Sequence, residues 1–147
     1  MDELRENVAA ERQRVETTLA ELSHALAREK RSTVELAGIA TFLLNVYNGI
    51  ENILKQVLRT EGVRIRASET WHTEVLNEAS VRGIISPDLR RDLRPFLGFR
   101  HFFVHGYGYM LEEAPLMDLA NRASTVWSRF IAEVERFVAE RSSAEHD

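Results

Sequence analysis

The chain has 147 residues, of which 44% are hydrophobic and 29% charged, a composition typical of a single globular domain. It contains no cysteine, which excludes disulfide bonds, thiolate catalysis and cysteine-based zinc sites. The amino terminus has no apolar leader segment, and no apolar run is long enough to span a bilayer, so we expect a cytoplasmic protein with no membrane partner. The net charge of −4 argues mildly against an obligate nucleic-acid coat but leaves room for a local basic patch.

Two long helices are predicted in the first sixty residues. Residues 2–29 carry apolar side chains at helical spacing with charges between them. Ser32 and Glu35 form a capping-box pattern that predicts the start of a second helix, and Gly62 is its expected end. This second helix has the most regular pattern of the chain, with apolar residues alternately three and four apart at Leu36, Ile39, Leu43, Val46, Ile50, Ile53 and Val57.

The rest of the chain predicts a short helix and two longer ones. A loop over residues 60–70 precedes a short helix at residues 71–78. The sequence Ser86-Pro87-Asp88 then begins a helix that runs to Gly106. A last amphipathic helix follows, and residues 141–147 are expected to fray. We therefore expect an all-α fold, an up-and-down bundle of four main helices plus a short helix, as one domain over residues 1–147.

Arg100 lies in the middle of the apolar stripe of its predicted helix. A guanidinium is not buried without a partner. Either an acid from a neighbouring helix meets it, or the stripe opens there onto a cleft or a second subunit. Glu51 is the natural acid, because Asn48, Glu51 and Asn52 are polar positions on an otherwise apolar helix. A buried Arg–Glu pair without any catalytic role is the simpler alternative.

His101 and His105 stand four residues apart, the helical spacing by which two imidazoles hold one metal ion. No third ligand is evident, so a metal site is the weaker interpretation. His105 lies about 140° around a straight helix from Arg100. The two side chains can meet only if the helix unwinds near Gly106 or if two copies of the chain share one site. Capping of the helix end is the simplest role for His105.

Arginine and histidine without metal or cysteine suit the cleavage of an RNA phosphodiester. Histidine moves protons near neutral pH, and a guanidinium stabilises negative charge on phosphate oxygens. From residue 82 to residue 108 there are five arginines and two aspartates, a net charge of +3 with histidine neutral. Arg90, Arg91 and Arg94 are the candidate contacts to RNA phosphates, although a solvated helix face explains the same charge count.

Arg100, His105 and Tyr107 form the pattern R-x4-H-x-Y within FRHFFVHGYGY. The segments TFLLNVYNGIENILKQVL, TWHTEVL and ISPDLRRDL precede it in that order. Together they resemble the HEPN superfamily, specifically the HepT-type ribonuclease toxins, over roughly residues 35 to 110. Pro95 and Gly98 depart from the ordinary helix formers that the resemblance leads us to expect before the motif.

The resemblance implies a HEPN-like all-α bundle that acts as a homodimer, in which the motif segments of both copies form one composite cleft. Arg100 and His105 would be the catalytic pair of a metal-independent endoribonuclease that needs no cofactor and takes RNA as its substrate. His101, Glu51 and Asn48 would support this pair.

The resemblance also implies a protein partner, an MntA-type nucleotidyltransferase antitoxin that transfers AMP to Tyr107 and blocks the cleft. Tyr109 is a second, weaker acceptor. Phe99, Phe102 and Phe103 add apolar surface near the motif, which favours a homodimer.

Two other functions stay open from the sequence. The chain could be a non-catalytic HEPN-fold module that dimerises and docks a nucleotidyltransferase, which suits its acidic net charge. It could also be a metalloprotein that uses His101 and His105.

Overall fold

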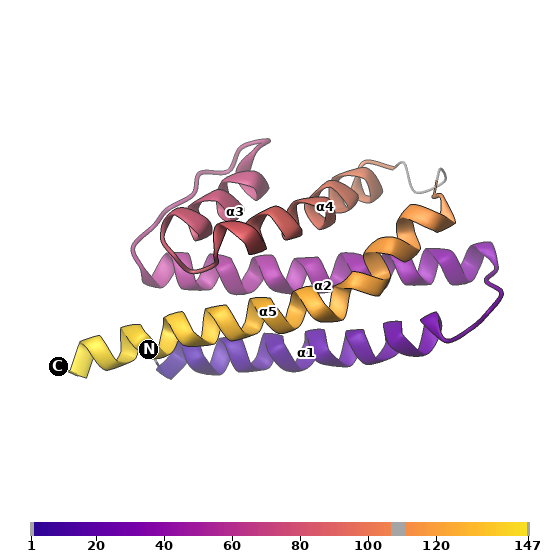
Figure 1. Ribbon diagram of the computed structural model, residues 1–147. Coiled ribbons are helices and arrows are strands. Elements are labelled where there is room, and N and C mark those ends of the chain that lie inside the picture. Colours follow the sequence, from indigo (N-terminus) through magenta and orange to yellow (C-terminus); the bar gives the residue numbers. More distant parts are fainter. Residues whose placement is uncertain (1, 107–110, 147) are drawn as a thin grey trace.

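The computed structural model describes residues 2–106 and 111–146, and all secondary structure within them is helical. The helices are α1 (Asp2–Leu26), α2 (Thr33–Thr60), α3 (Trp71–Val81), α4 (Pro87–Val104) and α5 (Glu113–His146). The long helices α1, α2, α4 and α5 alternate in direction, and the short α3 precedes α4 (Figure 1). The predicted all-α bundle of four main helices plus a short one is therefore confirmed. None of the described helices is long and apolar enough to cross a membrane.

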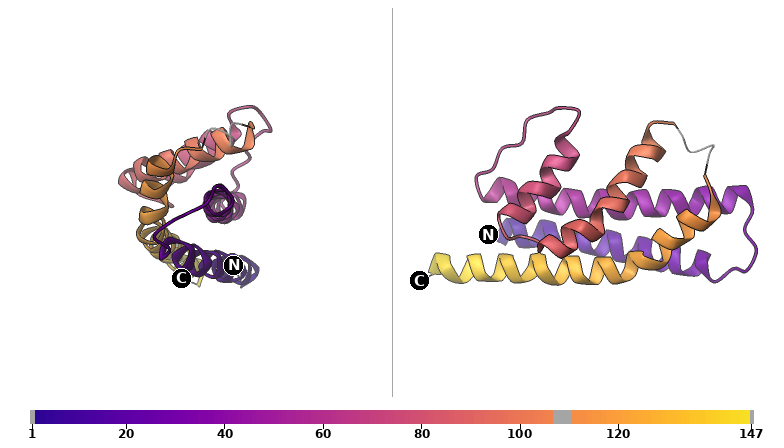
Figure 2. Two further views of the ribbon diagram at one scale, coloured as in Figure 1. Left: turned by 90° about the vertical axis from the view of Figure 1, so that its right-hand side faces the viewer. Right: turned by 45° about the horizontal axis from the view of Figure 1, so that its top comes forward.

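Helix α2 is the central element of the bundle. It packs against each of the four other helices, and Figure 2 shows α2 between the α1–α5 layer and the α3–α4 layer. The apolar seam predicted from the sequence is buried at Ile39, Leu43, Val46, Ile50, Ile53 and Val57. Because α2 has neighbours on several sides, Leu54 and Leu58 beside the seam are buried as well.

Two predicted helix starts are formed by serine caps. The Ser32 hydroxyl accepts from the Glu35 backbone N–H at 3.2 Å. The Glu35 carboxylate accepts from the Ser32 backbone N–H at 3.4 Å, which completes the capping box. Ser86 caps α4 by accepting from the Leu89 N–H at 3.1 Å. The Glu133 carboxylate of α5 also accepts from the Ser86 N–H at 2.6 Å, which attaches the start of α4 to α5.

Helix α2 ends in a Schellman motif around Gly62. Gly62 has a φ of 78°, a left-handed conformation that favours glycine. Its N–H donates to the Arg59 carbonyl at 3.0 Å, and the Val63 N–H donates to the Leu58 carbonyl at 2.9 Å. The chain therefore reverses direction sharply as it enters the loop before α3.

The expectation of a frayed tail differs from the structure, in which α5 continues past Arg141 to His146. Arg141 forms a salt bridge with Glu61 at 2.8 Å, and its guanidinium lies 4.9 Å from the centre of the Phe137 ring. Ser142 is 8% exposed. The last turns of α5 thus have partners at the end of α2, which the polar sequence of the tail does not disclose.

Gly49 marks a close approach of α1 and α2 and yields a test of the packing. A Cβ at Gly49 would lie 2.3 Å from Val15 Cγ2. We expect Gly49→Ala to lower the free energy of unfolding by about 1–3 kcal/mol because the two helices must separate. Gly38→Ala on the same helix is the control, since a Cβ there meets nothing within 4 Å. It is expected to raise stability by about 0.5–1 kcal/mol. Urea denaturation measures both, and an unchanged Gly49→Ala would contradict the packing.

Candidate functional site

The Arg100 side chain extends from α4 to α2. Its Nε donates a hydrogen bond of 3.0 Å to Oδ1 of Asn48. Arg100 is partly buried, and its two terminal nitrogens have no hydrogen-bond partner among the described residues. The contact therefore holds the guanidinium by one edge and leaves the remaining N–H groups for an anion.

Glu51, expected to be the acid that meets Arg100, contacts a different residue. Its Oε1 lies 2.7 Å from Nδ1 of His72, in the first turn of α3, and it forms no salt bridge with Arg100. Glu51 is 4% exposed, and its Oε2 is buried with no partner in the described part of the chain. The reason is geometric. Helix α3 contacts α2 at Glu51, whereas Arg100 of α4 contacts α2 at Asn48.

The Glu51 contact defines the state of the His72 ring. An ionised carboxylate can only accept a hydrogen bond, so Nδ1 of His72 is the donor. In a neutral ring Nε2 then carries the lone pair. This pairing of a buried carboxylate with an imidazole is one that orients a ring for proton transfer.

Tyr47 links these two contacts electrostatically. Burial raises the pKa of its hydroxyl far above the ordinary value, the negative charge of Glu51 raises it further, and the positive charge of Arg100 opposes the shift. The hydroxyl of Tyr47 is therefore close enough to feel both charges and stays protonated at neutral pH. Tyr47, Asn48 and Glu51 thus form a polar stretch of α2 between its buried apolar residues.

His105 is the capping residue at the end of α4. Its Nδ1 lies 2.8 Å from the carbonyl oxygen of His101, and its backbone N–H donates to the same oxygen at 3.1 Å. Gly106, with a φ of 86°, then turns the chain away. Because a carbonyl can only accept, Nδ1 donates. When the exposed ring is neutral, its Nε2 carries the lone pair and can act as a base.

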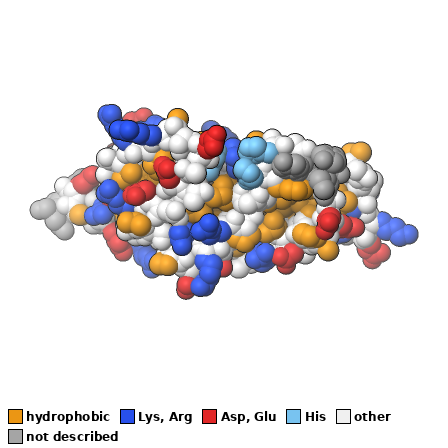
Figure 3. All heavy atoms as spheres, turned by 90° about the horizontal axis from the view of Figure 1, so that it is seen from above, with side chains coloured by type: hydrophobic (Ala, Val, Ile, Leu, Met, Phe, Trp, Pro, Cys, Tyr) orange, Lys and Arg blue, Asp and Glu red, His pale blue; other side chains and the backbone are white. Residues whose placement is uncertain are grey.

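His101 packs against His105 on the surface, with ring centres 4.0 Å apart. Figure 3 shows histidine side chains gathered on this face beside basic and hydrophobic groups. Among residues 2–106 and 111–146 there is no group of three or more histidines and acids placed to hold a metal ion. His101 and His105 form a pair of imidazoles in tilted contact at the end of α4.

Arg100 and His105 make no contact with each other among the described residues. Arg100 turns toward α2, whereas His105 folds back on the last turn of α4. Within one copy of the chain, both side chains come from the end of α4, but they have different partners. Tyr107, the expected AMP acceptor, and Tyr109 lie outside the described residues.

The three arginines expected to contact phosphate differ in their surroundings. Arg90 donates to the side chain of Asn77 and so connects α4 to α3. Arg91 forms an exposed salt bridge of 3.0 Å with Asp88. Arg94 is exposed and has no partner in the described chain. Two of the three can therefore bind a phosphate. Arg94 can do so directly, and Arg91 can do so once a phosphate replaces Asp88 in a weak surface salt bridge.

His72 is the residue of this site that reasoning from the sequence missed. It stands alone at the start of a short helix, without a recognisable motif partner nearby. The available signal was Glu51, because an acid in an apolar helix needs a buried partner, and His72 was a candidate donor as well as Arg100.

The Glu51–His72 contact predicts a stability difference between two substitutions. His72→Ala leaves the Glu51 carboxylate buried without a donor and is expected to cost about 1–3 kcal/mol of unfolding free energy. His72→Asn places an amide nitrogen where Nδ1 stands and is expected to retain most of that stability. Urea denaturation at neutral pH compares the two. Equal losses for both variants would show that packing of the ring, and not the hydrogen bond, is what matters.

Comparisons with known proteins assign the chain to a family. No curated protein and no solved structure matches the chain. A family model described as HepT-like protein matches residues 38–141. The match includes most of α2, all of α3 and α4, and every described residue of the candidate site. Since it covers more than half of the sequence, the chain belongs to the family of HepT-like proteins.

Proposed function

We propose that this HepT-like chain is a metal-independent endoribonuclease toxin that cleaves RNA with Arg100 and His105. Family membership supports a toxin-like protein of the HEPN type. The observation that carries the catalytic proposal is the state of the two side chains. Arg100 is held through Nε with its terminal nitrogens open, and His105 is held through Nδ1 with Nε2 open.

The chemistry assigns one task to each open group. Nε2 of His105 takes the proton of the RNA 2′-hydroxyl, whose oxygen attacks the adjacent phosphorus. The bond from phosphorus to the 5′-oxygen breaks, and that oxygen takes a proton from a second imidazole. The products are a 2′,3′-cyclic phosphate and a 5′-hydroxyl. The guanidinium of Arg100 stabilises the negative charge that gathers on the phosphate oxygens.

This in-line displacement needs a base and an acid on opposite sides of the phosphorus. His101 and His105 of one chain have ring centres only 4.0 Å apart, too close to flank one phosphate. A homodimer with a two-fold axis beside α4 would place two copies of His105 on opposite sides. We therefore propose that the active form is a homodimer with one composite cleft.

An apolar hollow of about 360 Å³ next to the motif is the proposed contact for the second copy. It lies between the second half of α4 and the start of α5, one helical turn from the histidines. Its lining includes Pro95, Phe99, Phe102, Leu111, Leu116 and Leu119. A partly buried apolar hollow that opens to the surface can take an apolar side chain of a second subunit.

The proposed regulator is an MntA-type nucleotidyltransferase that acts as the antitoxin. It would transfer AMP from ATP to the hydroxyl of Tyr107, with release of pyrophosphate. A phosphate and an adenosine two residues from His105 would occupy the position of the RNA phosphate and repel it. Transfer of labelled AMP to the wild-type chain but not to Tyr107→Phe tests this step.

Removal of either functional group is expected to abolish cleavage. Arg100→Ala and His105→Ala should each lower the rate of RNA cleavage in EDTA by about 100-fold or more. Arg122→Ala is the control, because Arg122 forms only an exposed pair with Asp118 on α5. Circular dichroism verifies that the variants fold. Folded variants that retain the wild-type rate and still inhibit growth would favour the non-catalytic docking module instead.

The composite cleft predicts how mixed dimers behave. If one site needs His105 from both copies, only wild-type homodimers are active. An equal mixture of wild-type chain and His105→Ala should then have, after subunit exchange, about a quarter of the activity of wild type at the same total concentration. Sites that act within one chain would retain about a half under the same conditions. Activity measured across mixing ratios, with light scattering to establish the oligomer, separates the two. A linear dependence on the wild-type fraction contradicts the shared cleft.

A further inference from the structure

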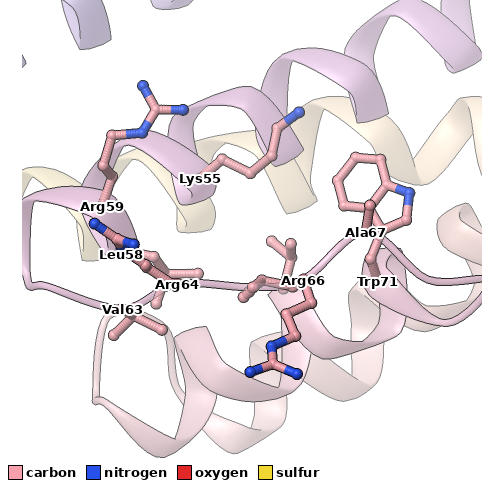
Figure 4. A pocket seen from close by; sticks show the side chains of 10 residues that line it. Lys55, Leu58, Arg59, Val63, Arg64, Arg66, Ala67 and Trp71 are labelled. Carbon is pink, nitrogen blue, oxygen red and sulfur yellow. The ribbon is translucent and has the colours of Figure 1, made fainter.

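A basic hollow of about 630 Å³ lies away from the motif, between the end of α2, the loop of residues 61–70 and the start of α3. Four cations and an indole ring line it: Lys55, Arg59, Arg64, Arg66 and Trp71. Figure 4 shows Lys55 and Arg59 extending from α2, with Trp71 beside the end of the Lys55 side chain. Arg64 and Arg66 extend from the loop, and the guanidinium of Arg66 points to the opposite side from the ends of Lys55 and Arg59. Two segments, the end of α2 and the following loop, therefore place positive charge around this hollow, and α3 adds the indole ring.

The loop alternates apolar and basic residues along its length. Val63 and Ile65 are partly buried and pack against the core, whereas Arg64 and Arg66 are exposed. In an extended segment successive side chains point to opposite sides, so anchoring the apolar pair turns both arginines outward. The reversal at Gly62 begins this arrangement directly after α2. The basic surface is thus a product of the fold of the loop and not of chance exposure.

The four cations have no acidic partner among the described residues. Most arginines elsewhere in the described chain donate to a carboxylate or an asparagine. Of the nearby acids, Glu61 pairs with Arg141 at 2.8 Å, and Glu74 accepts from the Thr70 hydroxyl at 3.0 Å. Glu69 of the loop is exposed and forms no ion pair with the four cations among the described residues. Like charges repel, so a group of four without counter-charges is poised to bind an anion.

Lys55 is held in place by an aromatic contact. Its Nζ lies 4.7 Å from the centre of the Trp71 ring, a cation–π arrangement. The contact keeps the ammonium at the hollow without neutralising it. A cation ordered in this way loses less side-chain freedom when it binds an anion.

A polar row along α2 connects the hollow to the candidate catalytic site. Asn48, Asn52, Lys55 and Arg59 are spaced four, three and four residues apart, so they follow one face of the helix. The row begins at Asn48, the residue that holds Arg100. Its length along the helix axis is about 16 Å. A polymer with regularly repeated negative charge could contact both ends, whereas a small anion could not.

We infer that the basic hollow is an accessory site for the phosphates of a single-stranded RNA whose scissile bond lies at Arg100. The inference rests on the proposed ribonuclease function and names how its substrate is held. The arginines supply paired N–H donors that match phosphate oxygens, and Lys55 supplies a point charge. The site would favour RNAs with a single-stranded extension long enough to follow α2.

The test neutralises the three arginines together in Arg59→Gln/Arg64→Gln/Arg66→Gln and leaves the catalytic residues unchanged. Substrates are a single-stranded RNA of roughly 16 nucleotides and a dinucleotide, whose single phosphate can occupy only the scissile position. The variant is expected to raise KM for the long RNA by about tenfold, with kcat unchanged. Cleavage of the short RNA should equal that of the wild type, because it cannot reach the hollow.

A binding measurement complements the kinetics. In the His105→Ala background, fluorescence anisotropy of the labelled long RNA gives affinity against salt concentration. Loss of three phosphate contacts should lower the slope of log affinity against log salt by about 2. The matched control is Arg14→Gln/Arg122→Gln/Arg136→Gln, which removes equal charge from exposed positions on α1 and α5. It is expected to leave KM and slope near the wild-type values.

The outcomes separate this site from the proposed function. If the wild type cleaves RNA and the triple variant matches it in KM and salt slope, the accessory site is overturned and the nuclease proposal stands. If the wild type cleaves neither RNA, the nuclease proposal fails. In that case, a lower salt slope for the triple variant still supports the hollow as an RNA site. Equal salt slopes for the variant and the wild type overturn it. Unchanged RNA binding with loss of binding to the nucleotidyltransferase would make the hollow a protein interface and overturn the RNA site.

Discussion

The position of α2 inside the bundle is the constraint on which the other features depend. A helix that packs against four others must be apolar over most of its circumference. The few polar side chains that it carries then need partners on neighbouring helices, because unpaired polar groups are costly in an apolar environment. Asn48 and Glu51 meet this requirement through Arg100 and His72. The contacts that define the candidate site are therefore also contacts that hold α3 and α4 against α2.

A buried charged contact is not the most stable way to fill such an interface. Well-packed apolar residues of similar volume often give equal or greater stability than a buried ion pair. The Glu51–His72 contact, with one carboxylate oxygen left without a partner in the described chain, is thus poorly explained by stability alone. What the contact does fix is the orientation of the His72 ring.

Net charge is a weak guide to what this protein can bind. The chain is acidic overall, yet several of its carboxylates form pairs with arginines on α1, α4 and α5. Cations that lack such pairs gather at the end of α2 and in the following loop. The potential that a ligand meets is set by this local distribution, since salt screens charges more than about 10 Å away. An acidic protein can therefore present a surface suited to a polyanion.

The sequence by itself determined the helices, their capped starts and the buried seam of α2, because these depend on residues three or four apart in the chain. It also determined that Arg100 needs a polar partner, since its place within an apolar stripe follows from helical spacing. It did not determine which partner. Asn48 and Glu51 lie within one turn of α2, and the choice between them depends on where α3 and α4 cross that helix. Tertiary packing likewise decided the helical end of α5, the pairing of Glu51 with His72 and the basic hollow, because each joins segments far apart in the sequence whose approach no local pattern encodes.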